Sequence, residues 1–77
     1  MDYGNNTEIF IADVSQAVRN ISTDYSLKIN LFDITETENG CELIVWLNDQ
    51  KLIRIKISKT LKNKKAILNY IKAQLSD

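Results

Sequence analysis

The sequence predicts an α+β domain in the order helix, three-stranded antiparallel sheet, helix, with both helices on one face of the sheet. Three observations lead to this prediction. Segments near the two ends of the chain carry apolar residues at steps of three or four. The middle of the chain alternates apolar and polar residues. The pair Asn39-Gly40 divides two of the extended runs, as the turn of a hairpin does.

Length and composition predict a single domain over residues 1–77. Of the 77 residues, 44% are hydrophobic and 26% are charged, which is ordinary for a folded protein. The chain contains no proline, repeat or low-complexity stretch, so we expect neither a linker nor a second domain. A domain this small buries only roughly 60% of its unfolded surface, and we therefore expect a thin core.

The first helix is predicted from about residue 7 to residue 21. One helical face carries its apolar residues, which are Phe10, Val14, Ala17, Val18 and Ile21. Asn5 or Asn6 can cap its start. The alternative for residues 8–11, Glu-Ile-Phe-Ile, is a short strand.

The hairpin turn is predicted at Asn39-Gly40, where both residues tolerate the positive φ of a type I′ turn. Pairing about this turn sets Ile34 opposite Val45 and Phe32 opposite Leu47. The strand before the turn changes from odd to even apolar positions, and a bulge near residues 31–32 reconciles its two halves.

The third strand, residues 52–57, alternates cleanly, with three isoleucines on one face. With residues 48–50 as the loop, Val45 pairs with Ile53 and Leu43 with Ile55. The opposite face then holds the neighbours Ile44 and Arg54, Trp46 and Leu52, and Glu42 and Lys56.

The last helix is predicted from about residue 61 to residue 75, with Thr60 or Asn63 as its cap. Its apolar stripe consists of Leu61, Ala66, Ile67, Leu68, Ile71 and Leu75. Both helices bury such a stripe most simply on the same side of the sheet.

No catalytic site is predicted, and we do not expect an enzyme. The chain has no histidine, one cysteine and only two glycines, and so lacks the usual bases, metal ligands and phosphate-binding loops. We expect no cofactor and no metal. Cys41 has no basic neighbour in the sequence, so we expect an inert thiol with an ordinary pKa.

The location is predicted to be cytoplasmic. A single cysteine cannot form an internal disulfide, which favours a reducing compartment. The first thirty residues resemble neither a signal peptide nor a membrane span, and we expect no membrane partner. Richness in Asn, Lys and Ile, without proline, is typical of AT-rich bacterial or phage genomes.

Charge is separated along the chain, although the net charge is zero. Residues 1–50 carry two basic and nine acidic side chains, whereas residues 51–77 carry eight basic and one acidic. Such asymmetry indicates a charged partner.

Trp46 is the first candidate binding residue, because helices on the isoleucine face would leave the indole on the open face. Its predicted neighbours there are Ile44, Leu52, Arg54 and Lys56. An exposed aromatic residue with apolar neighbours and an arginine has the composition of a binding hot spot. The alternative is that a bulge or the N-terminal segment covers Trp46 and makes it part of the core.

Two charged groups are further candidates. Glu36, Glu38 and Glu42, with other acids near the two hairpin loops, would steer a basic surface of a partner; the alternative is a soluble loop. A set of lysines surrounds the start of the last helix or lies along it: Lys59, Lys62, Lys64, Lys65 and Lys72. Together with free helix amides they would bind an anion or phosphate, the alternative being a solvated basic face.

The element order, with Lys64-Lys65-Ala66 opening the last helix, resembles the double-stranded RNA-binding domain. The resemblance covers most of the chain and implies lysines presented to phosphates. The chain departs from that family in two places. It has no glycine-rich entry to the last helix, and a tight acidic turn at Asn39-Gly40 replaces the loop that reaches a groove.

The function predicted first is a non-enzymatic interaction module, a small regulator or inhibitor that binds a larger protein through the open sheet face. The second is nucleic-acid binding through the C-terminal lysines, against which zero net charge counts. The third is a homodimer, in which either oppositely charged elements or two open faces pair.

Overall fold

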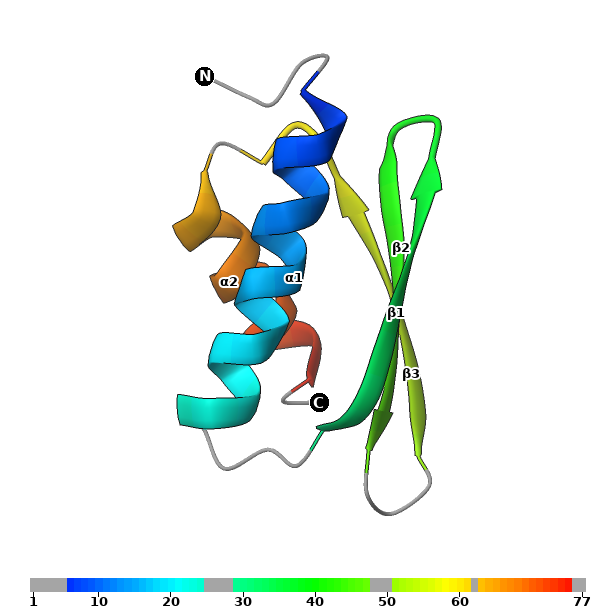
Figure 1. The fold of residues 1–77 in the computed structure, drawn as a ribbon, viewed down its shortest axis with the longest axis vertical. Helices are drawn as coiled ribbons and strands as arrows, with labels where there is room; N and C mark the ends of the chain where they lie inside the picture. The colour runs from blue at the N-terminus through cyan, green and yellow to red at the C-terminus, as the bar shows by residue number, and fades with distance from the viewer. Residues whose placement is uncertain (1–5, 25–28, 48–50, 62, 76–77) are drawn as a thin grey trace.

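The computed structural model describes residues 6–24, 29–47, 51–61 and 63–75. Its elements are α1 (Thr7–Asp24), β1 (Ile29–Thr37), β2 (Gly40–Leu47), β3 (Leu52–Ser58) and α2 (Lys64–Leu75). The strands form one antiparallel sheet in the order β1-β2-β3. Both helices lie on one face of this sheet and contact each other (Figure 1). The predicted fold class is therefore confirmed.

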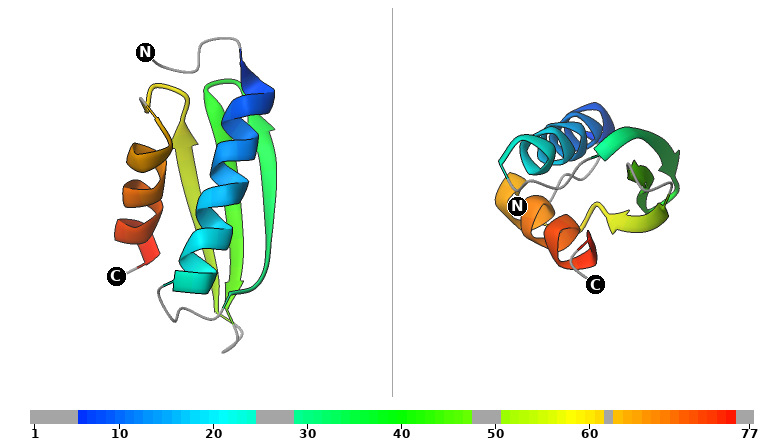
Figure 2. Two further views of the ribbon diagram at one scale, coloured as in Figure 1. Left: turned by 60° about the vertical axis from the view of Figure 1, so that its left-hand side comes forward. Right: turned by 90° about the horizontal axis from the view of Figure 1, so that it is seen from below.

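The two helices run side by side in the same direction (Figure 2). α1 begins where predicted and continues to Asp24, and residues 8–11 are helical. The amide of Phe10 donates a hydrogen bond to the carbonyl oxygen of Asn6 at 3.0 Å, which makes Asn6 the N-cap residue. Asn5, the other predicted cap, lies outside the described residues.

α2 begins at Lys64, three residues later than predicted. The side-chain Oδ1 of Asn63 accepts a hydrogen bond from the amide of Ala66 at 2.9 Å, so Asn63 is the cap. Thr60 instead donates its amide to Ser58 Oγ at 3.2 Å. Local side-chain bonds of this kind hold the chain in a turn before the helix starts.

The core lies between the helices and the inner face of the sheet. Its most deeply buried side chains come from both helices and from two of the strands: Phe10, Val14, Val18 and Ile21 from α1, Leu43 and Val45 from β2, Ile55 and Ile57 from β3, and Ile67 and Ile71 from α2. From β1, Ile29, Phe32 and Ile34 pack against this cluster while partly buried. The apolar stripes predicted for both helices therefore face the sheet.

The predicted register of the first hairpin is wrong by two residues. Ile34 lies opposite Leu43, and Phe32 lies opposite Val45. The turn consists of residues 38–39, and Gly40 already belongs to β2. A shift of two residues leaves every side chain on the same face, so alternation of apolar residues did not expose the error.

Gly40 lies in the strand, where the backbone of β3 packs against it. A Cβ atom at this position would overlap the carbonyl oxygen of Ile57 and lie 3.0 Å from Ser58 Cα. No side chain fits at that separation. The glycine is thus needed for a close approach between strands, and its predicted place in the turn is wrong.

The predicted irregularity in β1 is present, slightly earlier than expected. The register with β2 shifts between Ile29, which pairs with Leu47, and Leu31, which pairs with Trp46. The bulge brings Ile29 and Phe32 to the same face, although one number is odd and the other even. Leu31 consequently lies on the opposite face.

The predicted register between β2 and β3 is confirmed. Val45 pairs with Ile53 and Leu43 with Ile55. The predicted neighbours on the opposite face are confirmed as well: Ile44 with Arg54, Trp46 with Leu52, and Glu42 with Lys56.

Candidate functional site

The sheet face opposite the helices, here called the open face, is arranged in lateral rows that run across β1, β2 and β3. The strand pairings define an apolar row of Leu31, Trp46 and Leu52; a mixed row of Asp33, Ile44 and Arg54; and a polar row of Thr35, Glu42 and Lys56. The register therefore brings together most of the predicted binding residues, namely Trp46, Ile44, Leu52, Arg54, Lys56 and Glu42.

The apolar row is the most exposed apolar part of the sheet. Leu31 is 51% exposed and Leu52 is 44% exposed. Trp46 lies between them and is partly buried. Among the described residues, the core cluster and the side chains packed against it include neither Trp46 nor Ile44.

Leu31 was not among the predicted site residues. A bulge at residues 31–32, as the sequence predicts it, would keep Leu31 on the same face as Ile29. The bulge precedes Leu31, however, and turns it outward. The signal was present in the sequence, since adjacent apolar residues such as Leu31 and Phe32 cannot share a face of a regular strand.

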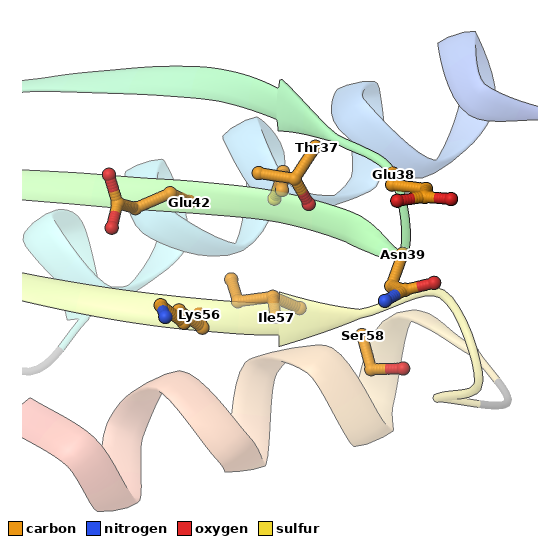
Figure 3. Close-up of a pocket in the computed structure, with 8 residues that line it drawn as sticks. Thr37, Glu38, Asn39, Glu42, Lys56, Ile57 and Ser58 are labelled. Atoms are coloured by element: carbon orange, nitrogen blue, oxygen red, sulfur yellow. The ribbon is translucent and has the colours of Figure 1, made fainter.

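The charges of the open face differ between its two edge strands. Asp33 is on β1, whereas Arg54 and Lys56 are on β3, and all three are exposed. Asp33 Oδ1 accepts a hydrogen bond from the amide of Ile34 at 3.0 Å. Glu42, on the central strand, lies beside Lys56 (Figure 3).

The three predicted acidic residues do not share one surface. Glu42 belongs to the open face, and Glu38 lies in the turn between β1 and β2. Both residues line a pocket of about 410 Å³ (Figure 3). Glu36 pairs with the inward-facing Cys41 and lines a depression with the first turns of α1. Glu36 therefore lies on the helix-bearing side, away from Trp46.

The predicted lysines are spread over several contacts. Lys59 is half-buried and donates from Nζ to Thr7 Oγ1 at 2.9 Å, which joins the end of β3 to the start of α1. Lys64 Nζ lies 4.0 Å from Asp13 Oδ1 in an ion pair whose lysine is largely exposed. The pair therefore joins a solvated lysine to a largely buried aspartate, since Asp13 is only 9% exposed.

Lys65 is exposed beside Lys64. Lys72 lies in the last turn of α2 and is half-buried; eight residues of helix place it roughly 12 Å along the axis from Lys64. Lys62 lies outside the described residues. Three of the described lysines thus lie along α2 and Lys59 follows the end of β3, so they do not form one compact cluster.

The thiol of Cys41 is buried, at 2% exposure. Burial raises its pKa to about 11 from the ordinary value of 9.0. The predicted ordinary pKa is therefore wrong, because the register places Cys41 on the inner face, where the thiolate loses its hydration. A thiol with this pKa carries very little thiolate at neutral pH and is a poor nucleophile.

Within the described ranges, no three His, Cys, Asp or Glu side chains come together in a way that would hold a metal ion. Neither of the helices in the part of the chain that the structure describes is long and apolar enough to cross a membrane. Comparison of the chain with protein-family models, with curated proteins and with solved structures finds no match.

Proposed function

We propose that this chain is a non-enzymatic protein-interaction module, a small regulator or inhibitor that binds a protein partner through its open face. The observation that carries the proposal is the apolar row. Two half-exposed leucines flank a tryptophan on a sheet face that the described helices leave uncovered. Exposed apolar groups that contribute nothing to the core gain free energy only when a partner removes them from water.

The composition of the open face fits such a partner. Tryptophan and arginine are enriched among residues that dominate binding energy, and Trp46 and Arg54 occupy adjacent strands. The charged side chains beside the apolar row would orient the partner and exclude wrong ones. Glu38 and Glu42 supply the acidic part of this rim, and Lys56 supplies a basic part.

The proposed setting is the reducing cytoplasm, where Cys41 stays a buried free thiol. The raised pKa of this thiol also supports a non-enzymatic role, because nucleophilic catalysis by cysteine needs an accessible thiolate.

The test is affinity capture from the native host, with the captured proteins identified by mass spectrometry. Each identified protein is then purified, and its binding to this chain is measured directly. Trp46→Ala is expected to weaken binding of the purified partner by at least about ten-fold, as hot-spot truncations do. Ile9→Ala is the matched control, because Ile9 is 55% exposed but belongs to α1. Equal binding by wild type and Trp46→Ala would refute the proposal.

A second candidate function is nucleic-acid binding, favoured by Lys64 and Lys65 in the first turn of α2. Free amides at a helix start, with lysines beside them, suit phosphate groups. Fluorescence anisotropy with a labelled RNA duplex is expected to show affinity that falls steeply as salt rises. Unchanged affinity in the double variant Lys64→Ala, Lys65→Ala would exclude this interface.

A further inference from the structure

Opposite charges occupy the two edge strands of the open face. Asp33 and Arg54 lie in the same lateral row, on opposite edge strands, with Ile44 between them on β2. In the neighbouring row, Leu31 and Leu52 flank Trp46 in the same way. In these two rows, one edge strand carries an acid and the other carries a base, and the central strand carries apolar residues.

A surface of this kind is complementary to itself. Sheets that pack face to face keep their strands within about 30° of each other. If a second copy is turned by a two-fold axis parallel to β2, its β3 lies over β1 of the first. Asp33 then meets the Arg54 of the other copy, twice by symmetry, and Trp46 and Ile44 meet their own counterparts along the axis.

We propose that the occupant of the open face is a second copy of this chain, packed about such a two-fold axis. The inference rests on the proposed function because it uses the same open face, and it names a second copy of the chain, instead of a different protein, as the occupant of that face. The charges favour this occupant, because Asp33 and Glu42 balance Arg54 and Lys56, so that the face has no net attraction for an acidic or a basic surface. Only a partner with the reversed arrangement satisfies both edges.

The size of the open face limits the area that a dimer can bury. Three strands spaced about 4.8 Å apart, with seven residues rising about 3.3 Å each, give a flat area of roughly 300 Å² per copy. The accessible area of the face is larger than this flat figure because side chains give it relief, but the face remains small beside the roughly 800 Å² of accessible surface per partner in a standard interface. We therefore expect a small interface and seek association at concentrations up to about one millimolar.

Glu42 lies on the central strand and meets the Glu42 of the second copy near the axis. Lys56 lies next to it in the same row and offsets part of the repulsion. Glu42→Gln removes the repulsion and is expected to tighten the dimer by about two-fold or more. A basic partner protein, in contrast, would bind this variant less tightly.

The decisive test is charge exchange between two variants, followed by sedimentation velocity at concentrations from micromolar to about one millimolar. Asp33→Arg alone and Arg54→Asp alone are each expected to weaken self-association at least about ten-fold, because each sets like charges opposite each other. An equimolar mixture of the two is expected to form a heterodimer, since the arginine introduced into one variant would meet the aspartate introduced into the other.

The matched controls change the same charges away from the open face. Glu36→Arg changes an exposed acid on β1 that lies on the helix-bearing side, and Arg19→Asp changes an exposed arginine on α1. Both controls are expected to self-associate as the wild type does. A loss of association in these controls as large as in the open-face variants would overturn the proposed geometry.

The outcomes separate the inference from the proposed function. A monomer at all concentrations, or a mixture of the two variants without a heterodimer, overturns the inference. If Trp46→Ala still weakens capture of a different purified protein, the open face remains a binding surface and only the choice of partner is wrong. If Trp46→Ala alters neither kind of association, both proposals fail.

Discussion

Both faces of the sheet carry large apolar residues, but only those of the inner face are covered by the helices. On the inner face, Leu43 and Ile55 are at most 2% exposed beneath the helices. On the open face, Leu31 and Leu52 are about half exposed. Adjacent residues of β2, Leu43 and Ile44, point to opposite faces, and only Leu43 belongs to the core cluster.

This contrast shows how apolar residues in a small sheet divide between two tasks. An alternating strand needs one apolar face for folding, and the inner face serves that purpose here. A second apolar row on the other face adds nothing to this core. Its apolar area is therefore available for association, which is the basis of the proposed function.

The strongest test of this comparison is truncation of an inner leucine. Leu43→Ala is expected to reduce the free energy of unfolding by about 3 to 5 kcal/mol, because Leu43 is fully buried and leaves a cavity. Urea denaturation followed by circular dichroism measures this loss. A loss below about 1 kcal/mol would show that the inner face is not the core.

The free energy of unfolding at alkaline pH tests the burial of Cys41 on the inner face. Its folded pKa of about 11 lies above the ordinary 9.0, so the stabilisation is complete below pH 9 and is lost as the pH rises to 11. The expected loss is up to about 3 kcal/mol. Cys41→Ala is the control and should lack this part of the pH dependence. Identical pH profiles would show that the thiol titrates normally.

Gly40 tests how closely the strands approach each other at the end of the sheet. Gly40→Ala is expected to cost about 2 kcal/mol, because the new methyl group would overlap the carbonyl of Ile57 and force the strands apart. Thermal unfolding is compared with that of Asn39→Ala, a change in the adjacent turn. Equal stability of wild type and Gly40→Ala would mean that β3 does not approach β2 as closely as described.

The smallest effect on stability is expected on the open face. Leu52→Ala should change the free energy of unfolding by less than about 0.5 kcal/mol, measured in dilute solution, because Leu52 is already 44% exposed. The same variant should weaken association through the open face. A stability loss close to that of Leu43→Ala would erase the distinction between the two faces.

Much of the fold follows from local patterns in the sequence. The apolar steps of α1 and α2 and the alternation of β3 predict the elements and the face that each one buries. The register between β2 and β3 follows as well, since a three-residue loop leaves one pairing that keeps Ile53 and Ile55 in line with Val45 and Leu43. These features depend on residues close in sequence, which is why local patterns predict them.

Other features depend on contacts between distant segments. The predicted hairpin register was wrong because a two-residue shift preserves both faces, and the actual register sets the backbone of β3 against Gly40. Similarly, Lys59 was predicted as part of an anion site, yet its Nζ contacts Thr7, 52 residues away in sequence. Neither contact produces a periodic pattern in the sequence from which it could be predicted.

For the candidate site, the amino-acid pattern was enough to place Trp46, Ile44, Leu52, Arg54 and Lys56 on one face, because strand alternation and a short loop suffice for that. The folded sheet was needed to add Leu31 and Asp33 to that surface and to remove Glu36 from it. The physical reasons are the position of the bulge, which lies before Leu31, and the length of β1, which continues in regular alternation to Thr37 and so sets Asp33 and Glu36 on opposite faces. Both depend on how the whole sheet packs beneath the helices, and that packing is a property of the folded chain.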